Sequence, residues 1–139
     1  MKNIRKGDSL SKIRILQIVT RLVVRGVPRH VLNIAERLDS NRFSVDVLAG
    51  SGLSQEGSLW EEAQSRGIKI NQVASLQRAI DPKTDIAALV ALYEKIKQGR
   101  YHIVHTHISK AGILGRLAAR IAGTPVILHT YHGEVDELR

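Results

Sequence analysis

The feature that most constrains the fold is a regular alternation of short apolar runs with amphipathic segments. Five runs rich in β-branched residues have strand character, and they cover residues 13–20, 43–49, 68–73, 101–107 and 126–130. Apolar residues recur with helical spacing in the four segments between them, which lie at 28–40, 57–66, 85–98 and 109–121. Strands that alternate with helices form a parallel sheet covered on both faces. We therefore expect an α/β fold, a doubly wound Rossmann-like parallel sheet with strand order 3-2-1-4-5.

Individual residues predict where the helices begin and which faces they bury. Asp85 is expected to cap the third helix and Ser109 the fourth, because both side chains can accept hydrogen bonds from free backbone N–H groups. Gly112 and Gly115 each cost the fourth helix about 1 kcal/mol relative to alanine. They therefore indicate close packing against a neighbour or a ligand. The stripe of that helix expected to face the core comprises Ile113, Leu114, Leu117, Ala118 and Ile121.

Length and composition limit the class of protein. The chain has 139 residues, of which 43% are hydrophobic, and this fits one domain at 13–139 after a flexible basic lead-in at 1–12. The absence of cysteine excludes a disulfide scaffold, a thiolate metal site and a cysteine nucleophile. No stretch reaches the roughly 18 apolar residues of a spanning helix. The polar N-terminus also lacks the apolar core of a signal peptide, so we expect a cytoplasmic protein.

The formal net charge of +8 favours anionic partners. Lysine and arginine are scattered along the chain, however, and few aromatic residues lie among them, so nucleic acid is not an expected partner. A phosphate-bearing ligand, or peripheral contact with the inner face of the membrane, fits this charge better.

The first candidate site element is the turn that follows the first strand. In the expected strand order the sheet reverses direction between strands one and four, and ligands of open α/β sheets bind there, at the carboxyl ends of the strands. The turn contains Arg25 and Gly26, and a glycine before a helix lets the backbone approach a phosphate. Gly26 as a turn residue alone is an equally good interpretation. The pattern is not G-x-G-x-x-G, and no acidic residue ends the second strand, so an NAD site is not expected.

The second candidate element is the end of the fourth strand. His107 lies at the last position, where a neutral imidazole can hydrogen-bond a sugar hydroxyl or assist proton transfer. His105 is expected inside the sheet, satisfied by hydrogen bonds. Ser109 and Lys110 follow in the first turn of the next helix. An anion would explain a lysine at that position, although a solvated lysine is an equally good interpretation.

A metal site is not favoured by this pattern. His105 and His107 share one face of a strand, but no third ligand is near in sequence, although His129 and His132 follow the fifth strand. His132 and Gly133 face the same rim of the sheet, either as the edge of a cleft or as a loop alone.

Two stretches resemble a known family. HIVHTHISKAGILGRLAARIAGTPVILHTYHG resembles the second half of the N-terminal domain of the retaining glycosyltransferases of family 4, which have the GT-B fold. These enzymes often contain VHTHSSKAG, then LGR-x-AA-x-x-x-G-x-P, then a strand that ends in T-x-HG. VTRLVVRGVPRHVLNIAERL resembles the first strand, glycine loop and helix of the same domain. The resemblance covers about residues 13–133 and makes the chain one half of a GT-B architecture.

The resemblance implies transfer of a sugar from a nucleotide-sugar donor to a glycan or lipid-linked acceptor, with no further cofactor. It places Gly26 against the diphosphate of the donor and His107 against the transferred sugar or the acceptor, as the catalytic residue of this half. His132 and Gly133 then lie at the rim of the cleft. The candidate ligand-binding residues are Arg25, Gly26, Ser109, Lys110, His132 and Gly133.

The sequence departs from the family pattern in three respects. Arg25 stands where a second glycine is common, His102 stands where the strand often begins with aspartate, and residues 134–139 differ from the usual continuation. A GT-B enzyme also has a C-terminal domain, which holds most of the nucleotide and the E-x7-E carboxylates. We therefore expect a truncated domain that needs a C-terminal partner domain for activity. The alternatives are a non-catalytic Rossmann-like binding module and a fragment of another nucleotide-binding enzyme.

Overall fold

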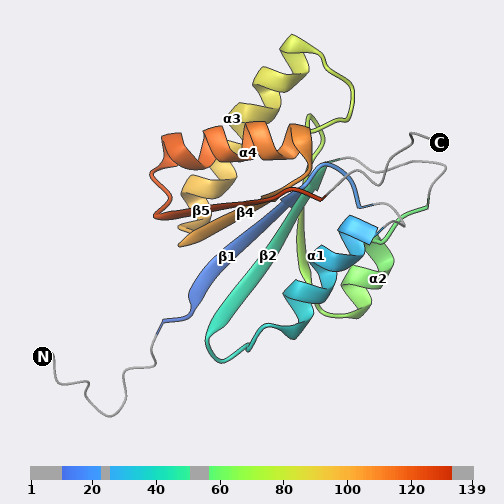
Figure 1. Ribbon diagram of the computed structural model, residues 1–139, viewed down its shortest axis with the longest axis vertical. Coiled ribbons are helices and arrows are strands. Elements are labelled where there is room, and N and C mark those ends of the chain that lie inside the picture. The colour runs from blue at the N-terminus through green and yellow to red at the C-terminus, as the bar shows by residue number, and fades with distance from the viewer. Residues whose placement is uncertain (1–10, 23–25, 51–56, 133–139) are drawn as a thin grey trace, which may run out of the picture.

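The computed structural model describes residues 11–22, 26–50 and 57–132 (Figure 1). Strands and helices alternate throughout these residues, as the sequence predicts. The elements are β1 (Ile13–Val19), α1 (Gly26–Arg37), β2 (Phe43–Gly50), α2 (Trp60–Ser65), β3 (Lys69–Val73), α3 (Pro82–Gly99), β4 (Ile103–His107), α4 (Ser109–Ala122) and β5 (Val126–Thr130). None of the described helices is long and apolar enough to cross a membrane.

The five strands form one parallel sheet in the order β3-β2-β1-β4-β5, which confirms the predicted fold class and strand order. β1 is the central strand. It pairs with β2 along its whole length, from Ile13 opposite Phe43 to Val19 opposite Ala49. On its other side it pairs with β4, from Ile15 opposite Ile103 to Ile18 opposite Thr106. The chain therefore adds β2 and β3 on one side of β1, and then returns to add β4 and β5 on the other side.

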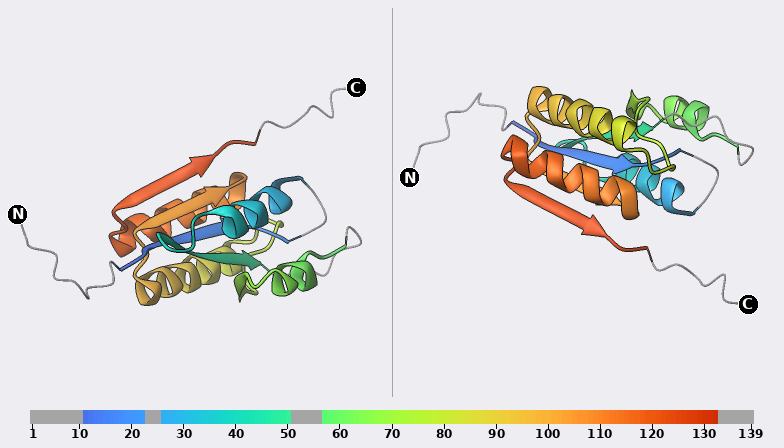
Figure 2. Two further views of the ribbon diagram at one scale, coloured as in Figure 1. Left: turned by 90° about the horizontal axis from the view of Figure 1, so that it is seen from below. Right: turned by 90° about the horizontal axis from the view of Figure 1, so that it is seen from above.

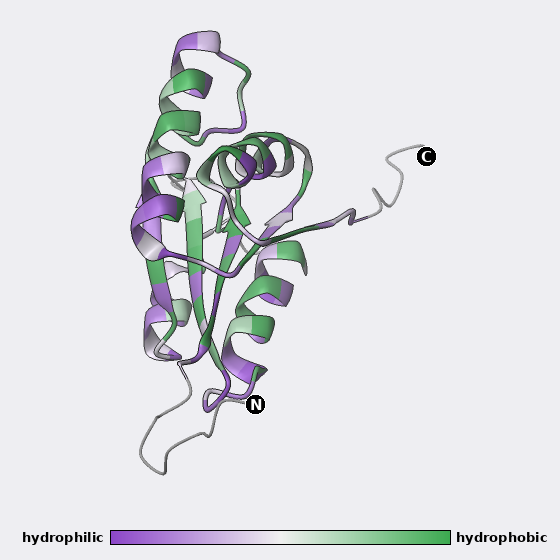
Figure 3. Ribbon diagram, turned by 90° about the vertical axis from the view of Figure 1, so that its left-hand side faces the viewer, coloured by the Kyte–Doolittle hydropathy of each residue, from purple (hydrophilic) through white to green (hydrophobic). Residues whose placement is uncertain are grey.

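Helices cover both faces of the sheet, with α1 and α2 on one face and α3 and α4 on the other (Figure 2). The side chains of β1 alternate between two apolar clusters, because successive residues of a strand point to opposite faces. Leu16 and Ile18 join the cluster beneath α3 and α4. Val19 joins the cluster beneath α1 and α2. The apolar stretches of the strands lie between the amphipathic helices that cover them (Figure 3).

The predicted core face of α4 is wrong for three of its five residues. Ile113, Leu117 and Ile121 are 61%, 44% and 59% exposed. The residues that face the sheet are small, because α4 lies close to it: a Cβ at Gly115 would stand 2.7 Å from the Thr106 methyl carbon. The buried residues of this helix are Ala111, Gly112, Gly115, Ala118 and Ala119. Ile113, Leu117 and Ile121 therefore point away from the sheet, whereas Leu114 packs against the edge of the core.

Gly112 and Gly115 are explained by packing against neighbouring side chains, which is one of the two alternatives predicted for them. A Cβ at Gly112 would stand 2.9 Å from Nδ1 of His129 and closer still to its Cε1. Bulkier residues at these two positions would push the helix off the sheet.

Both predicted helix caps need correction. α3 begins at Pro82 with Asp81 at the N-cap, so Asp85 lies inside its first turn rather than capping it. Proline is favoured at the first helical position because its missing N–H has no partner there in any case. α4 begins at Ser109 and its N-cap is Ile108, so Ser109 is not the cap. On α3, Ile86 and Val90 are exposed.

Gly50 is the glycine with the least room around it. A Cβ there would lie 2.5 Å from the carbonyl oxygen of Thr20 and against the carbonyl oxygen of Leu76. Both are backbone atoms that cannot rotate away. We expect Gly50→Ala to lower the free energy of unfolding by about 3 kcal/mol, measured by urea denaturation.

The matched control for this variant is Gly26→Ala, because a Cβ at Gly26 meets no atom within 4 Å. This control should leave the stability unchanged or raise it by up to about 1 kcal/mol. Equal stability of the two variants would contradict the packing described for Gly50.

Candidate functional site

The candidate site lies at the carboxyl ends of β1, β4 and β5, at the point where the strand order reverses. Open α/β sheets bind their ligands at this edge, because the loops that leave neighbouring strands diverge there. The side chains that meet are Gln17 of β1, His30 of α1, His105 and His107 of β4, and His132 just after β5. Four histidines from three separate parts of the chain therefore form one cluster.

His107 is the centre of this cluster and is completely buried. Its Nε2 lies 2.6 Å from the amide oxygen of Gln17, and its Nδ1 lies 2.9 Å from Nε2 of His132. The His105 ring packs against it with 4.1 Å between ring centroids, and the His132 ring stacks on it at 5.2 Å. Both ring nitrogens of His107 are therefore engaged by protein atoms. The expectation that the His107 ring reaches an open cleft is therefore wrong.

His132 is the member of the cluster that reaches the surface. It is partly exposed and lies 5.8 Å from the His30 ring, edge to face. His107 supports it from beneath. His107 is thus buried below the rim of the site, and His132 lies at the rim, where it was predicted.

Burial favours the neutral form of several of these histidines. The pKa of His107 is lowered to about 3, mainly by burial and further by the neighbouring histidines. Burial is also the main cause that lowers the pKa of His105, His129 and His132, with neighbouring cationic groups adding to it. At neutral pH these rings are therefore neutral imidazoles, which can donate one hydrogen bond and accept another. This is the form that pairs with the hydroxyl of a sugar or alcohol.

Hydroxyl groups hold the flanking histidines in place. His105 Nε2 lies 2.6 Å from Oγ1 of Thr130, so His105 is satisfied within the sheet as predicted. On the opposite face of the sheet, His129 Nδ1 lies 2.8 Å from Oγ1 of Thr106. These bonds join the ends of β4 and β5 side by side.

A shallow groove runs from His30 along the side of α1. Its volume is about 360 Å³, and its lining residues are His30, Asn33, Ile34, Arg37 and Leu38. His30 also contacts His132, so the groove opens beside the histidine cluster. The lining combines apolar, amide and cationic groups, which suits a ligand with an apolar part and an anionic part.

The structure describes Lys110 and Gly26 among the remaining predicted site residues. Lys110 forms an ion pair with Asp85 of α3 and donates a hydrogen bond to the carbonyl oxygen of Ala79. Its charge is thus already matched, and it joins the loop before α3 to α4. Gly26 is the first residue of α1, with open space beside it. Arg25 and Gly133 lie outside the described residues, as does the side chain of Ser109.

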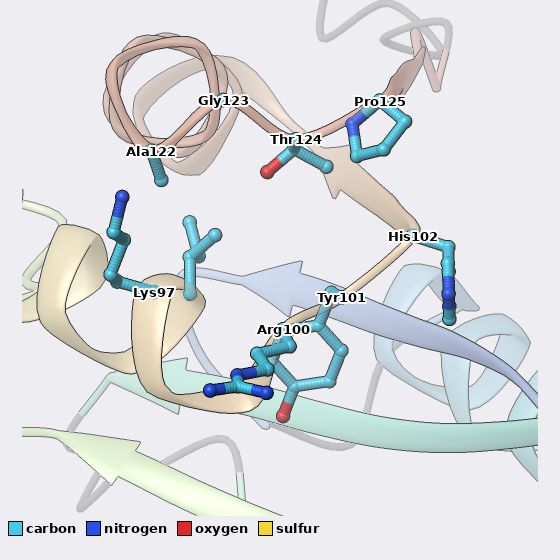
Figure 4. A pocket seen from close by; sticks show the side chains of 9 residues that line it. Lys97, Arg100, Tyr101, His102, Ala122, Gly123, Thr124 and Pro125 are labelled. Carbon is cyan, nitrogen blue, oxygen red and sulfur yellow. The ribbon is translucent and has the colours of Figure 1, made fainter.

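A second pocket, of about 310 Å³, lies at the opposite end of the sheet (Figure 4). It sits between the C-terminal ends of α3 and α4, and Lys97, Arg100 and His102 are among its lining residues. The carbonyl ends of two helices carry partial negative charge, and nearby cationic side chains offset it. The basic residues are therefore explained by the helix ends, and we do not assign a ligand to this pocket.

No group of three histidine, aspartate or glutamate side chains within the described ranges is arranged to hold a metal ion. In the histidine cluster the nitrogens of His107 face Gln17 and His132 rather than a common point.

Sequence reasoning missed Gln17 and His30. Gln17 interrupts the apolar run of the first strand, and a polar residue inside a buried strand requires a hydrogen-bonding partner. A polar residue at this position therefore predicts a buried hydrogen bond. His30 lies on a helix face and offered no comparable signal, because only the fold brings it to His132.

Comparison with known proteins agrees with this fold and identifies the family. The family model described as Glycosyltransferase Family 4 matches residues 24–138. The UDP-Gal:alpha-D-GlcNAc-diphosphoundecaprenol alpha-1,3-galactosyltransferase of Escherichia coli is 37% identical over 123 residues, which are 88% of this chain and 30% of that enzyme. The fold and these matches thus define a Rossmann-like N-terminal domain of the GT-B type. The chain belongs to glycosyltransferase family 4, and it spans about 30% of the length of this curated relative.

Solved structures share the fold at low sequence identity. A glycosyltransferase from Rickettsia africae is 24% identical with a TM-score of 0.68, and the match covers 91% of this chain and 31% of that one. The UDP-GlcNAc 2-epimerase of Neisseria meningitidis, bound to UDP-GlcNAc, is 14% identical with a TM-score of 0.56, and the match covers 81% of this chain and 31% of that one. The same fold therefore serves different reactions, and the family match rather than the fold indicates glycosyl transfer.

The neutral state of His107 predicts how stability depends on pH. Its pKa falls from 6.5 to about 3 on folding, so between these values the unfolded chain binds a proton that the folded chain does not. Stability is full above pH 6.5 and decreases below it, by about 1.4 kcal/mol per pH unit for this one residue. We expect His107→Phe to flatten the decrease, measured by urea denaturation at about pH 7 and about pH 5.

The matched control is His102→Phe, which replaces an exposed histidine at the opposite end of the sheet. This variant should keep the pH dependence of the unaltered chain. A pH dependence that is the same in all three proteins would contradict a buried neutral His107.

Proposed function

We propose that this chain forms the acceptor side of a glycosyltransferase that moves a sugar from a nucleotide-sugar donor to a saccharide linked to a lipid diphosphate. The observation that carries the proposal is the 37% identity to an enzyme whose name specifies UDP-galactose and an undecaprenyl diphosphate acceptor. The match covers 88% of this chain, and the family model matches residues 24–138, which include the ends of β4 and β5. A lipid-linked acceptor brings the reaction to the inner face of the membrane, from the cytoplasm.

The geometry of the rim supports this function. The neutral imidazole of His132, with the ring of His30 beside it, suits the hydroxyls of a sugar. The groove beside them adds Arg37 for an anionic group and Ile34 and Leu38 for an apolar one. A saccharide diphosphate with a lipid tail carries all three features.

Gly26 supports the assignment of the donor phosphates to the start of α1. Neither a positive φ nor close packing requires glycine there. A backbone without a side chain at a helix N-terminus instead leaves room for an anion. In the proposed enzyme, Gly26 lies against the diphosphate of the donor, and Arg25, Ser109 and Gly133 are further candidate ligand-binding residues.

We further propose that transfer needs a C-terminal domain which supplies most of the donor site. Beside the histidine cluster the described residues offer a rim and a shallow, open groove. The exposed row of Ile113, Leu117 and Ile121 on α4 supports a further packing partner, because large apolar patches mark interaction surfaces.

A chimeric enzyme tests this function. The matching 30% of the Escherichia coli galactosyltransferase is replaced with this chain, and transfer from UDP-galactose to GlcNAc-diphosphoundecaprenol is measured. We expect transfer by the chimera, and a loss of about 100-fold in kcat for its His132→Ala variant, because a rim imidazole contributes hydrogen bonding or proton transfer. His102→Ala, at the far end of the sheet, is the matched control and should keep the rate.

The chain alone provides a complementary measurement. Titration with UDP-galactose should give binding weaker than about 1 mM, since the proposed donor site lies mostly on the other domain. Tight binding by the chain alone would overturn the division between acceptor and donor sides. A folded chimera that leaves the acceptor unchanged would overturn the proposed acceptor.

A further inference from the structure

Gln17 is a buried polar residue to which the proposed function gives no role. It is 1% exposed, and it lies in the middle of the central strand, where apolar residues surround it. Its amide oxygen is 2.6 Å from Nε2 of His107. A buried amide is costly unless it is hydrogen-bonded, so this contact fixes both side chains.

The two hydrogen bonds of the buried His107 ring fix which nitrogen donates and which accepts. The Gln17 oxygen is an acceptor only, so Nε2 of His107 carries the hydrogen and donates it. In a neutral ring Nδ1 of His107 then has a lone pair, and it must accept from Nε2 of His132 at 2.9 Å. His132 therefore carries its own hydrogen on Nε2, and its Nδ1 is bare. Among the described residues, Nδ1 of His132 has no hydrogen-bond partner.

We propose that Gln17 is a positioning residue: acting through His107, it holds His132 in the tautomer whose bare Nδ1 accepts a hydrogen bond from a hydroxyl of the bound sugar. This inference rests on the proposed function for the identity of the ligand. The chain of hydrogen bonds from Gln17 to His107 to His132 itself rests on the described atoms alone. Because His107 is fully buried, water cannot replace either of its partners.

The neighbouring rings keep this chain aligned. His105 packs against His107 and is itself fixed by Thr130. His30 contacts His132 from α1. The rim imidazole is thus oriented by groups that do not touch the ligand, and such preorganisation is what positions a hydrogen-bonding group before substrate arrives.

Nitrogen NMR of the ¹⁵N-labelled 139-residue chain at neutral pH tests the inference without any ligand. The experiment reads which ring nitrogens carry hydrogen and detects the coupling across the bond between the two histidines. We expect hydrogen on Nε2 of both rings, and a coupling between Nε2 of His132 and Nδ1 of His107. Hydrogen on Nδ1 of His107, or no coupling in the folded chain, would overturn the inference.

Gln17→Met removes the acceptor and keeps the length of the side chain. It should abolish the coupling and leave His107 in a mixture of tautomers. Gln72→Met, an exposed position on β3, is the matched control and should leave both signals unchanged. If Gln17→Met does not fold, the spectra of the unaltered chain still decide the direction of the hydrogen bonds. Unchanged tautomers in a folded Gln17→Met variant would show that Gln17 does not position the ring.

The chimeric enzyme separates this inference from the proposed function. Gln17→Met in the chimera should lower kcat about tenfold with the KM for UDP-galactose unchanged, since only the rim imidazole loses its orientation. An unchanged kcat in an active chimera would overturn the positioning role. An inactive chimera whose spectra show the expected hydrogens would instead count against the proposed function, while the ordering of His132 by Gln17 would stand.

Discussion

The pairing of β1 with β4 is the constraint on which the rest of the structure depends. The two strands are 88 residues apart in sequence where they pair, yet their hydrogen bonds place Gln17 opposite His105 and Ile18 opposite Thr106. This pairing makes β1 central, reverses the strand order beside it, and sends α3 and α4 to the face opposite α1 and α2. It also brings the amide of Gln17 beneath the histidines of β4. The chemistry of the rim is therefore a product of the sheet topology.

The strands, the order of the sheet and the end at which the site lies could all be predicted from sequence, because each follows from short-range patterns and from general rules for parallel sheets. The orientation of α4 could not. Its large apolar residues suggested a core face, whereas the sheet accepts only the row of glycine and alanine that recurs at positions 111, 115, 118 and 119. A row of small residues at helical spacing was the more informative pattern, because close approach to a sheet excludes large side chains.

The site shows a similar limit. The residue types of His107 and Lys110 predict ligand binding, but the partners of both side chains are protein residues far away in sequence. Gln17 is 90 residues from His107, and Asp85 is 25 residues from Lys110. Local sequence shows that a polar side chain must find a partner, but it does not show whether that partner is a ligand or the protein. His132, which was predicted at the rim and lies there, has a buried neighbour rather than solvent behind it.

The outer edge of β5 has a consequence for handling the chain by itself. Among the described residues β5 is an edge strand, with Val126 and Leu128 exposed on one face and backbone groups open along its free side. Such an edge is a template on which another strand can pair. Two copies of the chain can therefore pair through their β5 edges and form one continuous sheet. Association of the chain should then increase with its concentration, and a charged substitution at Leu128 should suppress this association.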